Sequence, residues 1–248
     1  MGFWPVVLNV LKNSDIVLLL ADARMPELTQ NSEIIAKSER MNKKVVLVFN
    51  KIDLIGEKDK NELAKNFPNS FQISAAKKTG IKELKKHLEK EADLHSRPSL
   101  RVGIVGYPNV GKSTLINLLA PQAKAKVSSV SGTTKKTQWI RVGKIRIMDS
   151  PGVIPAGDQK IQLGLTASKD PHKIKNPEKI AIEIIEFLEK KGYSSLKKFY
   201  DVTGSSSYEI FEKIGKKKGF LIKGGEIDEN RTAIKIIDDW QKGKIKVE

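Results

Sequence analysis

Residues 106–113 form the most chemically specific stretch of the sequence. They read Gly-Tyr-Pro-Asn-Val-Gly-Lys-Ser and fit the pattern GxxxxGK[ST], between an apolar run and a helix-like segment. The glycines of such a loop let backbone N–H groups cradle phosphates at the positive end of a helix. In this motif the lysine reaches the β- and γ-phosphates and the hydroxyl binds Mg²⁺, which assigns those roles to Lys112 and Ser113. The nucleotide contacts expected from the loop are Asn109, Val110, Gly111, Lys112, Ser113 and Thr114.

A second polar cluster, Asn50-Lys51-Ile52-Asp53, follows the apolar run 45–49. A carboxylate can accept hydrogen bonds from both N1–H and the exocyclic amine of guanine, and adenine lacks this pair of donors. Asp53 would therefore select guanine, Asn50 would support the loop, and the stem of Lys51 would pack over the base. Asn and Asp are common in turns, so the cluster is a weak signal alone. Beside a phosphate loop it predicts a guanine nucleotide.

These motifs need a scaffold that brings them to one edge of a sheet. Residues 1–152 alternate continuous apolar runs, typical of buried parallel strands, with helix-like segments. The expected strands are 16–20, 45–49, 71–73 and 102–105, and the expected helices are 31–40, 58–66, 81–91 and 112–119. Runs 138–142 and 144–148 flank Gly143 and predict a hairpin. The pattern predicts a doubly wound α/β sheet with its ligand beyond the carboxyl ends of the strands.

The sequence changes character after Gly152. Asn176 and Pro177 are typical of an N-cap followed by the first residue of a helix, and apolar residues then recur at helical spacing up to Gly192. Further helices are expected over 194–202, 207–218 and 228–241. We expect two domains, a nucleotide-binding domain over residues 1–174 and a small all-α domain over residues 175–248.

Composition narrows the choice of partner. The chain carries a formal net charge of +16, and residues 1–152 hold 26 Lys/Arg against 14 Asp/Glu. Such an excess favours a polyanionic partner such as RNA, although a lysine-rich surface that keeps the protein soluble gives the same count. The absence of cysteine excludes disulfides and thiolate metal sites. Without a signal-like segment or an apolar run of about 18 residues, we expect a cytoplasmic protein with no membrane partner.

Three further stretches resemble motifs of Ras-like GTPases. They are the guanine loop Ser74-Ala75-Ala76-Lys77, the DxxG motif Asp149-Ser-Pro-Gly152 and the switch I motif Gly132-Thr-Thr134. Here the guanine motifs precede the phosphate loop, the reverse of the order in Ras. Together with Asp22-Ala23-Arg24-Met-Pro26, this rotated order resembles the circularly permuted GTPases of the YlqF family, which comprises ribosome biogenesis GTPase A and its archaeal and nucleolar relatives.

The resemblance implies a fold and an activity. The fold is a circularly permuted P-loop GTPase domain with a doubly wound mixed sheet, followed by a small all-α domain that binds RNA or the ribosome. The activity is hydrolysis of GTP to GDP and phosphate with Mg²⁺, in a ribosome assembly factor gated by its nucleotide. The partner is ribosomal RNA or a ribosomal subunit.

Roles for individual residues follow from the same resemblance. Ser74, Ala75 and Lys77 contact guanine; Thr134 and Asp149 join Ser113 around Mg²⁺; and the Gly152 N–H binds the γ-phosphate. Asn109 either coordinates K⁺ or supports the loop backbone. The catalytic set is then Lys112, Thr134, Gly152 and Asn109.

One residue limits the expected rate. Val153 stands where Ras-like enzymes carry a glutamine that positions water, so hydrolysis should be slow without a partner. A GTP-dependent RNA-binding scaffold with negligible hydrolysis therefore stays open as an alternative. The missing cysteines and modification domain disfavour a tRNA-modification GTPase, and the Asn-Lys-x-Asp motif disfavours an ATPase or small-molecule kinase.

Overall fold

The computed structural model describes residues 4–96, 98–121, 139–150 and 170–247. The chain divides into two compact units. Unit 1 comprises Met1–Asp53 and Glu57–Gly157, and unit 2 comprises Leu54–Gly56 and Asp158–Glu248. Among the helices of the described residues, none combines the length and the apolar character that crossing a bilayer requires.

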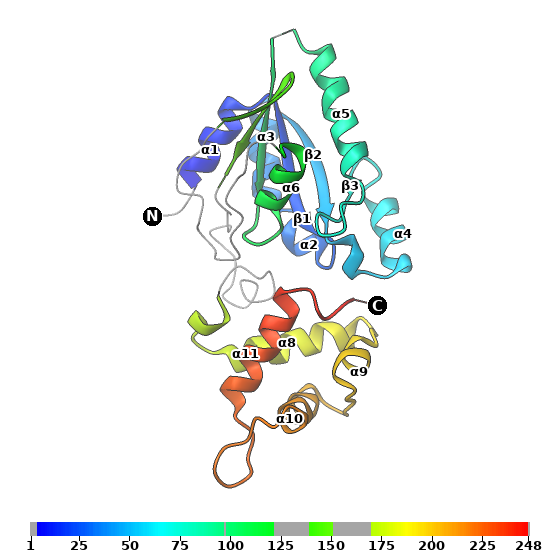
Figure 1. Ribbon diagram of the computed structural model, residues 1–248, viewed down its shortest axis with the longest axis vertical. Coiled ribbons are helices and arrows are strands. Elements are labelled where there is room, and N and C mark those ends of the chain that lie inside the picture. Colours follow the sequence, from blue (N-terminus) through cyan, green and yellow to red (C-terminus); the bar gives the residue numbers. More distant parts are fainter. Residues whose placement is uncertain (1–3, 97, 122–138, 151–169, 248) are drawn as a thin grey trace. The chain divides into compact units, whose positions relative to one another are not determined.

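A six-stranded sheet forms the centre of unit 1 (Figure 1). The strands are β1 (Ile16–Asp22), β2 (Lys44–Asn50), β3 (Phe71–Gln72), β4 (Leu100–Gly106), β5 (Trp139–Val142) and β6 (Ile145–Asp149). Their order is β3-β2-β1-β4-β6-β5, and all neighbours are parallel except β5 and β6, which form the expected hairpin. The prediction of a doubly wound mixed sheet is confirmed.

Helices cover both faces of this sheet. They are α1 (Trp4–Asn13), α2 (Pro26–Thr29), α3 (Ser32–Arg40), α4 (Glu57–Asn66), α5 (Ile81–Leu94) and α6 (Lys112–Leu119), with a 3-10 turn η1 at Ile52–Leu54. The sequence patterns did not predict α1 or α2. Figure 1 shows α1 and α3 on one side of the sheet and α5 and α6 on the other.

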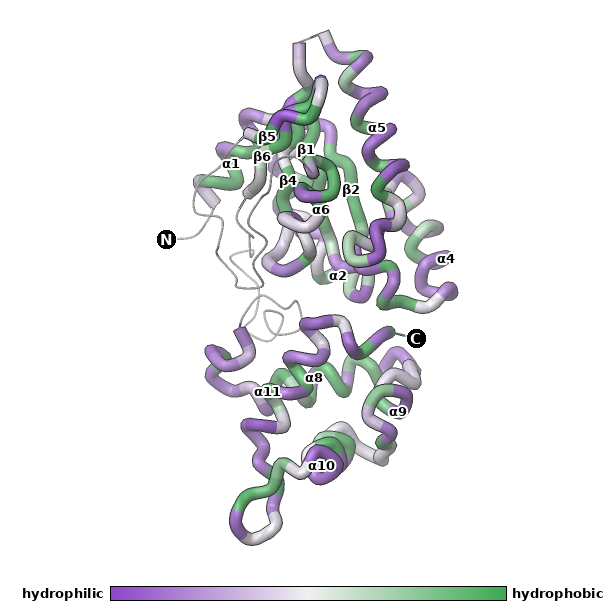
Figure 2. Tube along the Cα trace, viewed as in Figure 1, coloured by the Kyte–Doolittle hydropathy of each residue, from purple (hydrophilic) through white to green (hydrophobic). Residues whose placement is uncertain are grey.

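Strand β1 shows why these apolar runs are continuous rather than alternating. All seven of its residues are buried. Leu18 and Leu20 belong to the core cluster that includes α5 and α6, whereas Val17 and Leu19 belong to the cluster with α1 and α3. A strand with helices on both faces needs apolar side chains at every position, and each fully buried one contributes about 1.5–3 kcal/mol. Figure 2 shows hydrophobic colour along the central strands of unit 1.

Unit 2 is mostly helical. Its elements are η2 (Pro171–Lys173), α8 (Pro177–Lys190), α9 (Ser195–Tyr200), α10 (Ser207–Lys217) and α11 (Glu229–Gln241). Helix α8 begins at Pro177 as expected. The Asn176 side chain, however, makes no capping hydrogen bond with the described residues, and its backbone angles (φ −135°, ψ 76°) lie outside the usual extended N-cap range.

Two β-bridges supplement the helices of unit 2. One joins Leu221 to Ile227. The other is parallel and joins Ile55 to Val247, where the Gly56 N–H donates to the Val247 carbonyl (2.9 Å) and the Val247 N–H donates to the Leu54 carbonyl (2.7 Å). Unit 2 is therefore assembled from two stretches of chain that lie far apart in the sequence.

Candidate nucleotide-binding site

The phosphate loop connects the carboxyl end of β4 to α6. Gly106 has φ +150° and Gly111 has φ +102°, backbone conformations that side chains strongly disfavour. A Cβ on Gly106 would lie 2.2 Å from the Leu20 carbonyl oxygen, and one on Gly111 would lie 2.2 Å from Asn50 Nδ2. The loop thus keeps its shape only with glycine at both positions, as a backbone cradle for phosphate requires.

The side chain of Lys112 lies inside this loop. Lys112 is 7% exposed, and its ammonium donates hydrogen bonds to the carbonyl oxygens of Tyr107 (2.7 Å) and Gly106 (3.1 Å). The ammonium is thereby held within the turn where backbone N–H groups would meet phosphate. Ser113 and Thr114 follow in the first turn of α6 and are half-buried.

Asn50 joins the phosphate loop to the loop after β3. Its side-chain NH₂ donates to the Val110 carbonyl (2.7 Å), and its Oδ1 accepts from the Ala75 N–H (2.8 Å). Asn50 is 3% exposed, so losing either bond would leave a buried polar group unpaired, at a cost of about 1–3 kcal/mol. The Asn-Lys-x-Asp motif predicted a supporting role for Asn50 but not this bridge between two loops.

Asp53 and Ser74 come together at the base-binding side. The Ser74 hydroxyl donates to Asp53 Oδ1 and accepts from the Lys77 N–H (3.0 Å). Ser74 is fully buried, whereas Asp53 is half-buried on η1. This hydrogen bond fixes the rotation of the Asp53 carboxylate, the group expected to read guanine.

Two of the three expected Mg²⁺ ligands lie on described elements, Ser113 on α6 and Asp149 at the end of β6. Strand β6 ends at Asp149, whose register partner on β4 is Ile104, and the Ser150 hydroxyl donates to the Ile104 carbonyl (2.8 Å). Hydroxyl and carboxylate oxygens, as Ser113 and Asp149 carry, are the ligands that Mg²⁺ prefers, so the donor set fits this ion. Thr134, Gly152 and Val153 lie outside the described residues.

A buried charge cluster lies at the carboxyl ends of β1 and β2. Asp22 Oδ2 accepts hydrogen bonds from Lys51 Nζ (2.8 Å) and Arg24 Nη2 (2.8 Å), and Asp22 Oδ1 accepts from Arg24 Nε (3.1 Å). Burial would raise the pKa of the Asp22 carboxyl, but Arg24 and Lys51 bring it far below its ordinary value. Burial also lowers the pKa of the Lys51 ammonium, and the Asp22 carboxylate opposes that shift.

The sequence motifs did not predict this cluster, although they carry a signal for it. Both polar motifs follow expected parallel strands, and β1 and β2 pair with Asp22 opposite Asn50. Only the register, which the sequence does not specify, places Lys51 beside Asp22.

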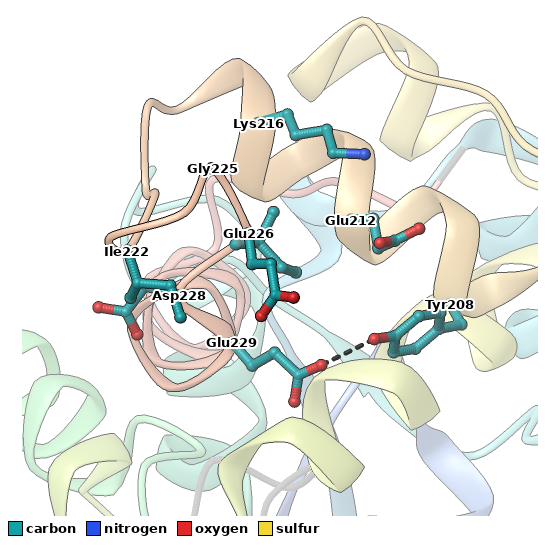
Figure 3. A pocket seen from close by; sticks show the side chains of 9 residues that line it. Tyr208, Glu212, Lys216, Ile222, Gly225, Glu226, Asp228 and Glu229 are labelled. Carbon is teal, nitrogen blue, oxygen red and sulfur yellow. Dashed lines mark hydrogen bonds between the residues drawn. The ribbon is translucent and has the colours of Figure 1, made fainter.

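A separate hollow lies in unit 2 (Figure 3). It has a volume of about 630 Å³, and its lining includes Tyr208, Glu212, Lys216, Glu226 and Glu229. The Tyr208 hydroxyl donates to Glu229 Oε1 (2.7 Å), drawn as the dashed line in Figure 3. None of the residues that line this pocket is a predicted site residue, and the surplus of carboxylates in its lining does not suit a phosphate ligand.

The chain matches two protein families and several relatives. The family described as 50S ribosome-binding GTPase matches residues 101–222, and the RsgA GTPase family matches residues 7–157. A GTP-binding protein of Methanocaldococcus jannaschii is 36% identical over 243 residues, which are 97% of this chain and 65% of the relative. Ribosome biogenesis GTPase A of Bacillus cereus is 33% identical over 261 residues, covering 96% of this chain and 86% of the relative.

The comparisons also include a longer relative and a solved structure with a bound nucleotide. Nucleolar GTP-binding protein 2 of Pneumocystis carinii is 32% identical over 255 residues, 98% of this chain but 52% of the relative. The chain thus spans about half to two-thirds of the length of these archaeal and nucleolar relatives. The crystal structure of GNP-bound YlqF from T. maritima has a TM-score of 0.66 at 25% identity and covers 98% of this chain and 94% of that one.

Proposed function

We propose that this chain hydrolyses GTP to GDP and phosphate and acts as a nucleotide-gated assembly factor on ribosomal RNA or a ribosomal subunit. The premise is that the chain belongs to the circularly permuted GTPase family of ribosome biogenesis GTPase A. The observation that supports binding of a guanine nucleotide is the pair of hydrogen bonds made by the Asn50 side chain. This one buried side chain holds the phosphate loop and the guanine loop together, so the residues for both ends of a guanine nucleotide belong to one site.

The residues of unit 1 divide the work of binding. The phosphate loop and Lys112 hold the β- and γ-phosphates, while Asp53, fixed by Ser74, accepts hydrogen bonds from the base. Ser113, Asp149 and Thr134 would hold Mg²⁺, which neutralises charge that develops on the transferring phosphoryl group. The Gly152 N–H would contact the γ-phosphate.

Hydrolysis should be slow for the isolated chain. Val153 cannot orient water, so the remaining stabilisation must come from positive charge around the phosphates. Asn109, in the left-handed conformation (φ +58°) within the loop, is our candidate ligand for K⁺. We expect faster turnover in K⁺ than in Na⁺ and loss of that difference in Asn109→Ala. Steady-state phosphate release in the two salts tests this, and equal rates for both proteins would remove the potassium role.

The proposed ribosomal partner rests on charge and on the relatives. Residues 1–152 carry the larger part of the +16 net charge, and the matched family is described as 50S ribosome-binding. Residues 175–248, proposed to bind RNA or the ribosome, follow Gly152 in the chain. Loss of the γ-phosphate at Gly152 would therefore change how this part of the chain engages its partner. We place this activity in the cytoplasm.

Two measurements test the proposal in sequence. Titration with fluorescent GDP, competed by GTP and by ATP, should show a strong preference for guanine nucleotides. Cosedimentation with ribosomal subunits should then depend on whether a GTP analogue, GDP or no nucleotide is present. Binding should weaken with salt by about 0.7–0.9 log units per log unit of salt for each phosphate neutralised. Binding that ignores both salt and nucleotide would contradict the assembly role.

Single-turnover hydrolysis addresses the scaffold alternative. We expect ribosomal subunits to accelerate hydrolysis of prebound GTP. If hydrolysis is negligible with and without subunits although cosedimentation depends on GTP, the chain is an RNA-binding scaffold instead.

A further inference from the structure

We propose that Asp22 is a positioning residue for guanine recognition: it anchors the Lys51 ammonium so that the Lys51 stem forms one wall of the base pocket. This inference rests on the proposed guanine-nucleotide function. It assigns a role to the acidic residue of the Asp22-Ala23-Arg24 motif, whose carboxylate binds the ammonium of Lys51.

The backbone brings the two residues together. Strands β1 and β2 are in register with Asp22 opposite Asn50, and the Ala23 N–H donates to the Asn50 carbonyl (2.8 Å). Lys51 then adopts φ +69°, a left-handed conformation that is uncommon for a residue with a side chain. The turn directs Lys51 back toward β1, where its ammonium lies 2.8 Å from Asp22 Oδ2.

The Asp22 carboxylate is itself immobilised. Asp22 is 2% exposed, and Arg24, whose side chain is fully buried, binds both carboxylate oxygens. The Thr29 hydroxyl accepts from the Asp22 N–H (2.9 Å), which fixes the end of the strand. Rigid support of this kind is what allows one side chain to set the rotamer of another.

Charge balance explains why the anchor is a carboxylate. Three charged neighbours act on the Lys51 ammonium: Arg24 repels it, and Asp22 and Asp53 attract it. Without the Asp22 charge, two cations would face each other in a buried site, an arrangement that is strongly unfavourable. The Lys51 ammonium would turn toward solvent, since its side chain is already 17% exposed, and its stem would leave the position expected over the base.

The test separates base recognition from phosphate binding. We would measure the affinity of wild type and Asp22→Asn for fluorescent GDP, and for pyrophosphate with Mg²⁺ by calorimetry. We expect GDP affinity to fall roughly 10-fold, within the range of coupling between contacting residues, while pyrophosphate affinity stays unchanged. If Asp22 had a purely structural role, the substitution would lower the affinity for both GDP and pyrophosphate.

A double-mutant cycle with Lys51→Met tests whether Asp22 acts through Lys51. Met keeps an apolar stem without the ammonium, so adding Asp22→Asn to Lys51→Met should weaken GDP by less than about two-fold. Losses that multiply fully in the double variant would overturn the proposal. So would an Asp22→Asn variant that binds GDP like wild type.

Two controls keep the result interpretable. Asp15→Asn breaks the half-buried Asp15–Arg101 pair just before β1, at the opposite end of the strand from the site, and should leave GDP affinity unchanged. If Asp22→Asn does not fold, Asp22→Asn/Arg24→Met removes the unpaired guanidinium and should fold. Repulsion from Arg24 is then gone but the carboxylate anchor of Lys51 is still missing, so GDP should bind more weakly than to wild type while pyrophosphate affinity stays unchanged. If wild type itself does not prefer GDP to ADP, the proposed function fails. If wild type prefers GDP but Asp22→Asn binds GDP equally well, only the positioning role fails.

Discussion

The two ends of β1 carry the same chemistry in different surroundings. Asp15, just before the strand, binds Arg101 through both carboxylate oxygens (Nη2–Oδ1 2.8 Å, Nε–Oδ2 3.1 Å). Asp22, at the last position of the strand, binds Arg24 in the same way. However, the Arg101 side chain is 29% exposed, whereas that of Arg24 is fully buried and shares its carboxylate with Lys51.

The difference shows how position in the sheet separates structural pairs from functional ones. At the amino end, the pair joins the start of β1 to β4, because the Arg101 N–H also donates to Asp15 (2.9 Å). At the carboxyl end, where ligands of open α/β sheets bind, the same pair supports a lysine of the candidate site. An ion pair alone therefore indicates neither role.

Asp53→Asn should produce the largest effect on nucleotide binding, because Asp53 follows the carboxyl end of β2 in the candidate site. The amide presents a donor where the carboxylate accepted two hydrogen bonds, and each mispaired buried group costs about 1–3 kcal/mol. We expect GTP affinity to fall roughly 30-fold or more and preference to shift toward xanthosine triphosphate. A competition titration measures both. Full GTP affinity in this variant would show that Asp53 does not read the base.

Asp15→Asn should produce a moderate effect of a different kind. It weakens charge-assisted hydrogen bonds, which contribute about 1.5–3 kcal/mol, so the free energy of unfolding should fall by about 1–3 kcal/mol. Urea unfolding followed by circular dichroism measures this change. GDP affinity should stay within two-fold of wild type. A larger loss of affinity would erase the contrast between the two ends of β1.

The smallest expected effect is on the dependence of the free energy of unfolding on pH, at acid pH. The pKa values of Asp15 and Asp22 are both lowered in the folded chain, although burial opposes the shift in each case, because their Arg partners favour the carboxylate. The unfolded chain then binds more protons below the ordinary carboxyl pKa of about 3.9, so stability is present above that pH and is lost as the pH falls further. As the pH falls from about 5 to about 2, urea midpoints should decrease less steeply in Asp15→Asn than in wild type. Parallel curves would mean that Asp15 is not part of the acid transition.

Much of unit 1 could be predicted from the sequence because its signals are local. The apolar run of β1, the glycines of the phosphate loop and the polar ends of β2 and β4 are each visible within a few residues. The mixed sheet followed from them. Helix α1 was missed because Val6, Val7 and Val10 interrupt the helical pattern with β-branched residues, which favour strands.

The remaining features depend on contacts between distant residues. The bridge from Asn50 to Val110 and the contact of Lys51 with Asp22 both require the register of paired strands, which short motifs do not encode. Likewise, nothing near Leu54–Gly56 in the sequence indicates that these residues group with unit 2. Such contacts are visible only once the chain is folded.

The pairing of Ile55 with Val247 also has a consequence for biosynthesis. About 190 residues separate the two partners, and ribosomes add roughly 5–20 residues per second. Residues 54–56 therefore leave the ribosome on the order of 10–40 s before their partner strand exists. During that interval the β-edge of Ile55 has no native neighbour from residue 247, and the last contact that completes unit 2 can form only after translation has passed Val247.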